Sequence, residues 1–323
     1  MEIRVIKTIL VPLDGSDVAE QGLVAACRIA TEVGATLHLV RALPYSALEE
    51  DVRFQEIQEL RQARAYLARI QRDLQQQGVV SIAEILPCDP VRAILFATEA
   101  HDVDLICIST HGRSGIQHTL LGSVAEAVLR QSTTPILLTR AAAHAAPPMA
   151  GPYGRILVPL DGTAFAETTL SYLRDQGVGR AASLLLLRAT PTPSQPFMPD
   201  VTGYAVPQLA QRETRERRLE GAAYLQALGA ARLADANWHT RAVIGDAAEA
   251  ILDQAEREGT DLIALATHGR HGWDRLLHGS VTRTLLHRTT VPLLILRGAA
   301  ADPAEPSVAA ASAQAILAAT AAR

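Results

Sequence analysis

The 323-residue chain has little aromatic character, little net charge and little cysteine, and each shortage excludes a class of function. Aromatic residues make up 4% of the chain and the net charge is −4, so we predict neither a base-stacking surface nor a basic face for nucleic acid. The three cysteines form no Cys-x-x-Cys pair, which argues against a disulfide framework and favours a reducing compartment.

Long hydrophobic runs are missing as well. No segment approaches the roughly 18 uncharged apolar residues that a membrane span needs. The amino-terminal stretch MEIRVIKTILVPLDGS lacks the apolar core and small-residue cleavage site of a signal peptide. We therefore expect a cytoplasmic protein with neither a membrane nor a nucleic acid as partner.

The sequence does contain an internal repeat. KTILVPLDGS at 7–16 returns as GRILVPLDGT at 154–163, and residues 109–130 return at 266–287 with ten of 22 aligned positions identical. The offset between the copies grows from 147 to 157 residues along the chain. We assign the extra length to the proline-rich segment 190–207, which reads as a loop.

The repeat predicts how the chain is divided. We expect one domain at 1–143 and a second at 154–298. The intervening residues 144–153 are rich in alanine, proline and glycine and read as a linker. Residues 299–323 form an alanine-rich tail to which we assign no function.

Each copy alternates short apolar strands with amphipathic helical segments. In copy one, TILVPL is followed by a helical pattern that stops at Gly34, and a long amphipathic segment stops at Gly78. Strands that are apolar on both faces and separated by helices indicate a parallel sheet covered on both sides. We predict an α/β fold of two tandem doubly wound domains, each with a five-stranded parallel sheet, in which ligands bind beyond the carboxyl ends of the strands.

A glycine-spaced loop follows the fourth strand of each copy. In copy one it runs from Gly112 to Gly122 and Ser123, where a helix is expected to begin. A helix start carries unpaired amide groups and a partial positive charge, and glycine lets a ligand approach the backbone closely. Ser123 can donate to a phosphate oxygen and Arg113 can add charge at the rim. The loop therefore favours a polyphosphate ligand.

Two residues near the first and second strands complete this interpretation. Asp14 follows the first strand, where a carboxylate can accept hydrogen bonds from ribose hydroxyls or an adenine amino group. Ala42 ends the second strand and leaves room for a flat base. We predict a nucleotide that lies across the strand ends, with its phosphates at Gly122 and Ser123.

These motifs are similar to those of a known family. VPLDGS, CDPVRAI at 88–94, STHGRSG-x6-GSV at 109–124 and the closing PILLTR resemble the universal stress protein family, and the resemblance covers both copies. It implies two tandem domains with the adenine nucleotide alpha hydrolase-like fold. Some members of that family bind ATP through a G-x2-G-x9-G-[ST] motif and others lack the glycines. The implied ligand is ATP, ADP or AMP, with or without Mg²⁺.

The motifs and the resemblance give one set of predicted nucleotide-binding residues in each copy. The set of copy one is Pro12, Leu13, Asp14, Ala42, Ser109, Thr110, His111, Gly112, Arg113, Gly122, Ser123 and Val124. The set of copy two is Pro159, Leu160, Asp161, Ala189, Ala266, Thr267, His268, Gly269, Arg270, Gly279, Ser280 and Val281.

The sequence departs from the family motif at three places. The first motif glycine is Ser109 in copy one and Ala266 in copy two, both small enough for us to expect retained binding. A family glycine near the end of the third strand is Cys88 in copy one but Gly245 in copy two. His278 stands where copy one has an apolar leucine before the second glycine. We expect the two copies to differ in affinity.

Competing interpretations stay open for several residues. Asp14 and Asp161 could merely cap the next helix, although Ser16 and Thr163 are better placed as N-caps. His111 could pack in its loop or touch the ligand. The histidines around His268 lack a nearby acidic or cysteine partner, so we predict no metal site there.

Catalytic motifs are also missing from the sequence. We find no P-loop lysine, no nucleophile elbow and no carboxylate pair beside the phosphate loop, so we predict no catalytic residue. Our main hypothesis is a nucleotide-dependent regulatory module in stress adaptation, as the resemblance implies. Slow ATP hydrolysis or adenylate transfer, and a scaffold with vestigial pockets, are the alternatives.

The last strand of each copy predicts how the copies associate. By resemblance, TPILLTR at 134–140 and VPLLILR at 291–297 are expected to pair within the chain as a pseudo-dimer. Two chains could associate further as a homodimer through the same strands.

Overall fold

The computed structural model describes residues 5–43, 50–110, 122–140, 151–192, 205–268 and 280–298. In copy one the elements are β1 (Thr8–Pro12), α1 (Asp17–Val33), β2 (Thr36–Ala42), α2 (Glu50–Gln76), β3 (Ser81–Leu86), α3 (Pro90–Ala100), β4 (Leu105–Thr110), α4 (Ser123–Gln131) and β5 (Ile136–Arg140). In copy two they are β6 (Arg155–Pro159), α5 (Ala164–Gln176), β7 (Ser183–Thr190), α6 (Ala205–Arg232), β8 (Asn237–Ile244), α7 (Ala247–Arg257), β9 (Leu262–His268), α9 (Ser280–Arg288) and β10 (Leu293–Gly298).

The first helix of each copy begins at the residue that the sequence predicts. The Ser16 hydroxyl accepts a hydrogen bond from the Ala19 amide at 3.2 Å, and Thr163 accepts from Ala166 at the same distance. Such N-caps satisfy amide groups that the helix itself leaves unpaired. α1 ends at Gly34 with φ 75°, a left-handed conformation that glycine adopts without a Cβ clash. Both predicted N-caps and the predicted stop at Gly34 are confirmed.

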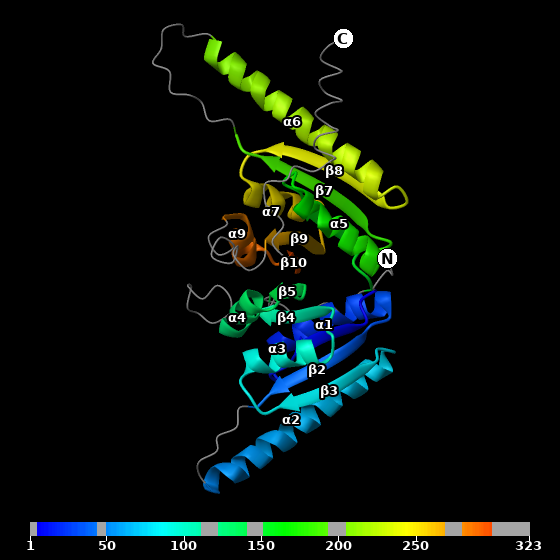
Figure 1. Ribbon diagram of the computed structural model, residues 1–323, viewed down its shortest axis with the longest axis vertical. Helices are drawn as coiled ribbons and strands as arrows, with labels where there is room; N and C mark the ends of the chain where they lie inside the picture. The colour runs from blue at the N-terminus through cyan, green and yellow to red at the C-terminus, as the bar shows by residue number, and fades with distance from the viewer. Residues whose placement is uncertain are drawn as a thin grey trace.

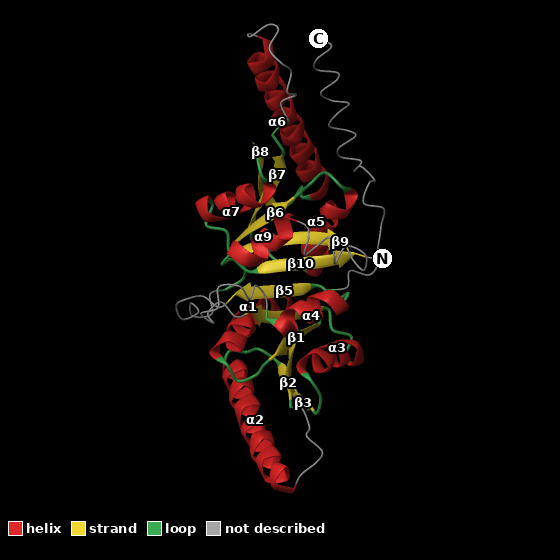
Figure 2. Cartoon of the chain, turned by 90° about the vertical axis from the view of Figure 1, so that its left-hand side faces the viewer, coloured by secondary structure: helices red, strands yellow, loops and turns green. Residues whose placement is uncertain are grey.

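The strands form one ten-stranded sheet in the order β3-β2-β1-β4-β5-β10-β9-β6-β7-β8. Within each half every pair of neighbours is parallel, and helices cover both faces (Figures 1 and 2). This confirms the predicted fold class of two doubly wound five-stranded units. The two units meet at β5 and β10, which pair antiparallel in the middle of the sheet.

The β5–β10 pair has an internal two-fold relation. Leu137 pairs with Leu294, and these two leucines are counterparts in the repeat. On either side, Ile136 pairs with Ile295 and Leu138 with Leu293. The same strand therefore faces itself across the junction, as two subunits do at a symmetric interface.

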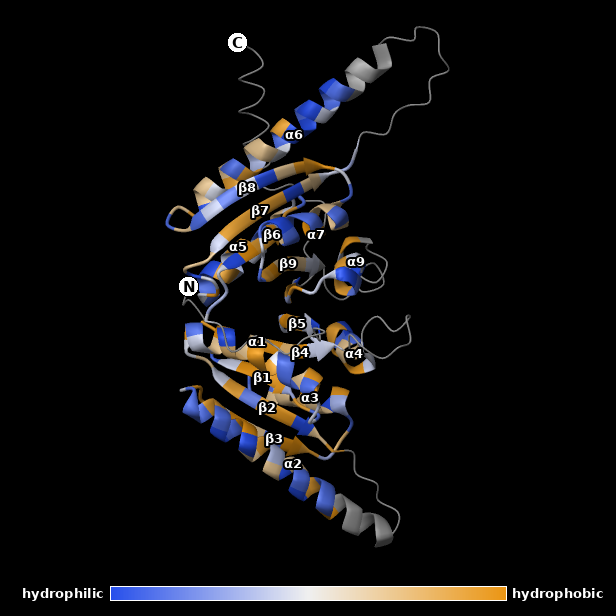
Figure 3. Ribbon diagram, turned by 180° about the vertical axis from the view of Figure 1, so that it is seen from behind, coloured by the Kyte–Doolittle hydropathy of each residue, from blue (hydrophilic) through white to orange (hydrophobic). Residues whose placement is uncertain are grey.

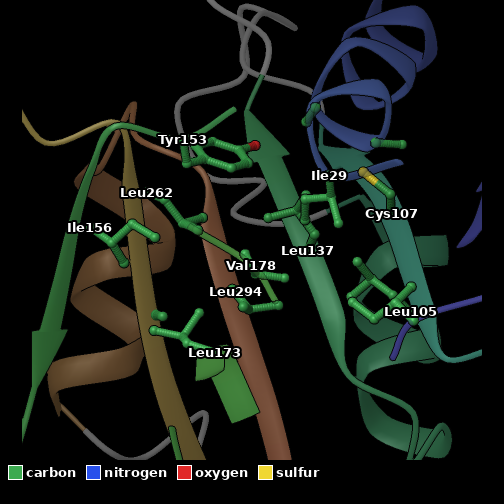
Figure 4. Close-up of a cluster of buried hydrophobic side chains, with 14 of the residues drawn as sticks. Ile29, Leu105, Cys107, Leu137, Tyr153, Ile156, Leu173, Val178, Leu262 and Leu294 are labelled. Carbon is green, nitrogen blue, oxygen red and sulfur yellow. The ribbon is translucent and has the colours of Figure 1, made fainter. Parts of the chain in front are cut away.

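A hydrophobic core runs through the junction without interruption. Figure 4 shows Leu137 and Leu294 between side chains of copy one, such as Ile29, and of copy two, such as Ile156. Tyr153, at the end of the predicted linker, is buried with 1% of its surface exposed. Its ring lies 3.8 Å from the Arg28 guanidinium of α1. The halves thus share apolar surface that neither could bury alone.

Charged groups complete the junction. Arg28 donates to Asp261 at 2.8 Å, and Glu32 accepts from the Gly179 and Arg180 amides at 2.9 and 3.0 Å. These contacts join α1 to loops of copy two.

The long helices α2 and α6 lie at the two ends of the sheet and point away from it. In Figure 3 both helices are coloured mostly hydrophilic, β3 and β7 are coloured mainly hydrophobic, and β8 is hydrophilic over its first residues. No helix in the described part of the chain is both long enough and apolar enough to cross a membrane.

Candidate functional site

A cavity of about 260 Å³ lies at the carboxyl ends of β1, β2 and β4, next to the first turns of α3 and α4. Its walls are apolar over most of their extent, and its polar groups come from Asp14, Ser109, Ser123 and the backbone near Gly122. Ligand pockets typically measure about 300–1,000 Å³, so this cavity is of the size that holds part of a small molecule.

Most of the predicted residues of copy one meet at this cavity. Those that line it are Pro12, Leu13, Asp14, Ala42, Ser109, Gly122, Ser123 and Val124. Thr110 does not line it, because its side chain is buried in the sheet and its hydroxyl donates to the Thr139 carbonyl at 3.4 Å. His111, Gly112 and Arg113 lie outside the described residues.

The loop after β1 fixes the position of Asp14. Oδ1 of Asp14 accepts from the Ser16 amide at 2.9 Å and from the Ser16 hydroxyl at 2.6 Å. Gly15 has φ 87°, which lets the chain turn sharply after the carboxylate. Copy two repeats this arrangement, since Thr163 donates to Asp161 from its amide at 2.9 Å and from its hydroxyl at 2.7 Å.

The start of α4 also lines the cavity. Gly122 is the N-cap and makes no side-chain capping bond, so the first-turn amides are open to a ligand. Ser123 is exposed at the same edge. The partial positive charge of the helix start favours an anionic group there.

The two copies differ at the ends of their fourth and fifth strands. In copy one the hydroxyls of Ser109 and Thr139 are 2.7 Å apart, and the two residues are paired across β4 and β5. In copy two the corresponding pair is Ala266 and Leu296, both apolar. The site of copy one therefore has a polar group that copy two lacks.

An arginine next to each aspartate loop was missed by the sequence analysis. A Cβ on Gly15 would lie 2.7 Å from Arg41 Nη1, and one on Gly162 would lie 3.0 Å from Arg188 Nη2. The Arg41 guanidinium lies 5.5 Å from the Tyr66 ring centroid. The sequence contained a signal for these arginines, because the second strand of each copy carries the similar triplets VRA at 40–42 and LRA at 187–189. Each arginine places a positive charge beside the loop that carries the aspartate.

In copy two a tyrosine and a glutamate join this cluster. The Arg188 guanidinium lies 4.7 Å from the Tyr224 ring centroid, and the Tyr224 hydroxyl donates to Glu167 at 3.0 Å. Burial, and then the Glu167 charge, raise the pKa of Tyr224. The phenol thus stays a hydrogen-bond donor at neutral pH.

The predicted residues of copy two occupy corresponding positions. At the ends of β6, β7 and β9, the half-buried or buried ones are Pro159, Leu160, Ala189, Ala266 and Thr267, whereas Asp161 is exposed. Thr267 donates to the Leu296 carbonyl at 3.5 Å, as Thr110 does to Thr139. His268 ends β9, Ser280 begins α9, and Val281 packs against the core. Gly269, Arg270 and Gly279 lie outside the described residues.

Several wall residues were not predicted. They are Ala19, Val40, Pro90, Ala93, Ile94, Ile108 and Ala125. A usable signal existed for Pro90, Ala93 and Ile94, since they belong to the CDPVRAI motif. The others are apolar core positions, and their place at a cavity depends on how the helices pack.

Comparisons with known proteins give the family of the chain. The sequence model of the universal stress protein family matches residues 6–140 and again 152–297, so the chain belongs to the universal stress protein family and carries its unit twice. A universal stress protein of Methanocaldococcus jannaschii is 31% identical over 139 residues, which cover 42% of this chain and 82% of that protein. One of Synechocystis sp. is 22% identical over 316 residues, which cover 90% of this chain and 100% of that protein.

Solved structures show the same fold. The structure of a universal stress protein from Archaeoglobus fulgidus superposes with a TM-score of 0.63 at 20% identity, over 90% of this chain and 98% of that one. A putative universal stress protein from Pseudomonas aeruginosa gives 0.61 at 18% identity, over 98% and 99% of the two chains.

Proposed function

We propose that the protein binds an adenine nucleotide in copy one and acts as a nucleotide-dependent regulatory module in a stress response. The observation that carries the proposal is the cavity at the strand ends, which both Asp14 and the start of α4 line. The aspartate accepts hydrogen bonds from the ribose or the base, Ala42 faces the base, and Gly122 and Ser123 hold the phosphates.

The chemistry of the walls supports a nucleotide over a simple anion. A purine needs a flat apolar slot, which Val40, Ala42 and Ile94 supply beside the strand ends. The carboxylate of Asp14 and the start of α4 have opposite electrostatic character, and both line the cavity. A ligand with a polar uncharged end and an anionic end fits this arrangement.

Copy two is proposed to bind the same ligand more weakly. It keeps the aspartate loop, but the Ser109–Thr139 hydroxyl pair is replaced by Ala266 and Leu296. Loss of one hydrogen-bonding group in a buried site typically costs about 1 kcal/mol. The full predicted sets of both copies, including the residues outside the described ranges, remain proposals.

The test begins with the purified full chain. We expect denaturation to release an adenine nucleotide that mass spectrometry identifies as ATP, ADP or AMP, and titration calorimetry, with and without Mg²⁺, to show tight binding to the stripped protein. Asp14→Asn should weaken the stronger binding step at least tenfold. Asp161→Asn is the matched control and should leave that step unchanged.

Other outcomes distinguish the alternatives. A chain that releases no nucleotide and binds none in the calorimeter would be a scaffold with vestigial pockets. Turnover of labelled ATP in a single-turnover experiment, abolished by Asp14→Ala, would instead indicate a slow ATPase or adenylate-transferring enzyme. We propose that no efficient turnover occurs.

The organisation of the molecule is also proposed. We propose domain limits at 1–143 and 154–298 and treat the β5–β10 contact as the pseudo-dimer interface of the two domains. Because both strands are interior to the sheet, a homodimer of whole chains would have to use another surface, which sedimentation analysis would detect. We propose a cytoplasmic location, which the free thiols of Cys27, Cys88 and Cys107 fit.

A further inference from the structure

Two histidines and a glutamate of copy one converge away from the cavity. His38 lies on β2, Glu84 on β3, and His101 immediately after α3. One carboxylate oxygen, Oε2 of Glu84, lies 3.3 Å from Nε2 of His38 and 3.2 Å from Nε2 of His101. The ring centroids of the histidines are 4.1 Å apart and the rings are nearly perpendicular. Three potential metal-ligand atoms thus surround one point, within 4.8 Å of one another.

These separations match a tetrahedral metal site. Zinc binds histidine nitrogen and carboxylate oxygen at about 2.0–2.2 Å, so two ligands at the tetrahedral angle are about 3.3–3.5 Å apart. Both nitrogen–oxygen distances here, 3.3 and 3.2 Å, agree with that value to within about 0.3 Å. The third separation, between the two histidines, is at most 4.8 Å, and the His101 side chain is 38% exposed.

His38 is the buried member of this group. Only 1% of the residue is exposed, and its Nδ1 has no hydrogen-bond partner in the protein, so Nε2 is the nitrogen that faces Glu84.

In copy two, other residues stand at the positions of the two histidines and the glutamate. The residues that correspond to His38, Glu84 and His101 are Leu185, Arg241 and Glu258. Leu185 is buried at 3% exposure, and Arg241 forms an ion pair with Glu258 at 3.6 Å. The fold therefore accepts an apolar residue at the buried position and needs no histidine there.

We propose that His38, Glu84 and His101 form a binding site for a divalent transition-metal ion, with zinc as the preferred ion. Two histidines and one carboxylate give three protein ligands and leave the fourth position to water. The exposed sides of Glu84 and His101 provide the path for the ion. Because α3 begins at the cavity wall with Pro90 and ends at His101, one helix connects this site with the cavity.

The experiment measures zinc alone, on the untagged full chain after removal of metal with a chelator. We expect competition with a chromogenic chelator at pH 7.5 to show one zinc ion bound per chain, with a dissociation constant in the micromolar range or below. His38→Leu and His101→Gln should each weaken this binding at least tenfold. His239→Gln, at an exposed histidine beside Glu258 in copy two, is the matched control and should retain it.

Two features keep the result decisive. His38→Leu introduces the residue that copy two already carries, and His101→Gln changes an exposed position, so both variants are expected to fold, as circular dichroism would check. Cobalt bound to the wild-type site should give the strong visible absorption of a tetrahedral centre, absent from both variants. No zinc binding below about 100 µM, or binding that both variants retain, would overturn the proposal.

Discussion

At the scale of single residues, the two copies differ in how the first helix packs against the fourth strand. α1 approaches β4 at Gly22, where an added Cβ would lie 2.7 Å from Ser109 Oγ and 3.4 Å from the Ser109 amide. In copy two the counterparts are Thr169, which is fully buried, and Ala266. A larger helix residue thus accompanies a smaller strand residue. Each copy therefore has a larger residue on only one side of the contact, so the total side-chain volume there changes little.

This exchange predicts strong coupling between Gly22 and Ser109. Gly22→Ala alone should destabilise the protein by about 1 kcal/mol, because overpacking of about 1–3 kcal/mol outweighs the helix propensity gained by alanine. In the Ser109→Ala background, which resembles copy two, the same change should be neutral or stabilising. A double-mutant cycle in urea should give a coupling energy of at least about 1 kcal/mol.

The control in this cycle is Ser109→Ala itself, which removes the 2.7 Å contact with Thr139 and should cost about 1 kcal/mol. Strictly additive effects would show that α1 does not approach β4 as closely as the structure indicates.

A second residue-scale prediction concerns pH. The pKa of His38 is lowered in the folded protein by burial and by His101, while the unfolded chain keeps the usual value near 6.5. As the pH falls, the unfolded chain takes up the proton first, so stability is complete above about pH 6.5 and is lost below it. We expect the unfolding free energy of metal-free protein to fall between about pH 7.5 and about pH 5.5, by at most about 1.4 kcal/mol per pH unit for this proton.

His38→Leu should reduce that slope, because leucine takes up no proton. His287 contributes in the same direction, since burial and then Arg283 and Arg140 lower its pKa, so part of the slope should remain in the variant. Parallel stability curves for the wild type and His38→Leu would contradict the assignment.

At the scale of elements, helix ends in each copy are completed by the other copy. Arg297 is the last residue but one of β10 and donates to the carbonyls of Leu129 and Ser132 at the end of α4. Arg140 ends β5 and donates to the His287 carbonyl at the end of α9. The last carbonyls of a helix lack partners within the helix and carry partial negative charge, so a guanidinium satisfies both needs.

Arg297→Ala should therefore destabilise the whole protein. Hydrogen bonds to charged groups contribute about 1.5–3 kcal/mol each when partly buried, and we expect a loss of at least about 1.5 kcal/mol. Arg130→Ala is the control on the same helix, since Arg130 forms an exposed i,i+4 pair with Glu126 that is worth about 0.3–0.5 kcal/mol. Equal losses in urea unfolding would mean that the crossing contacts contribute little.

The elements also show what the sequence could and could not predict. Strands and helices followed from period and caps, as at Ser16 and Gly34, because those signals are local. Eight cavity residues followed from the motifs at the strand ends together with the resemblance to the universal stress protein family. The walls at Val40 and Ile108, and the meeting of His38 with His101, depend on how distant elements pack. The hydrophobic periodicity of a sequence does not predict such long-range contacts, and His38 and His101 are 63 positions apart.

At the scale of the whole molecule, the junction resembles a subunit interface closed within one chain. Leu137 pairs with its own counterpart Leu294, so the contact has an approximate two-fold symmetry. Both leucines are fully buried in one core cluster with residues of both copies. Separation of the halves would expose this surface together with the unpaired edge of a hydrophobic strand, which favours association.

A chain cut to residues 1–150 should accordingly self-associate. Its β5 can pair with β5 of a second copy, with Leu137 opposite Leu137 and Ile136 opposite Leu138, because the native pairing of Ile136 with Ile295 has that symmetry. Sedimentation at micromolar concentration should show a dimer. Leu137→Lys, which places a charge at the centre of the contact, should give a folded monomer or an unfolded chain but no dimer. A wild-type fragment that stays monomeric and folded would show that the antiparallel pair and the shared core contribute little to the stability of either half.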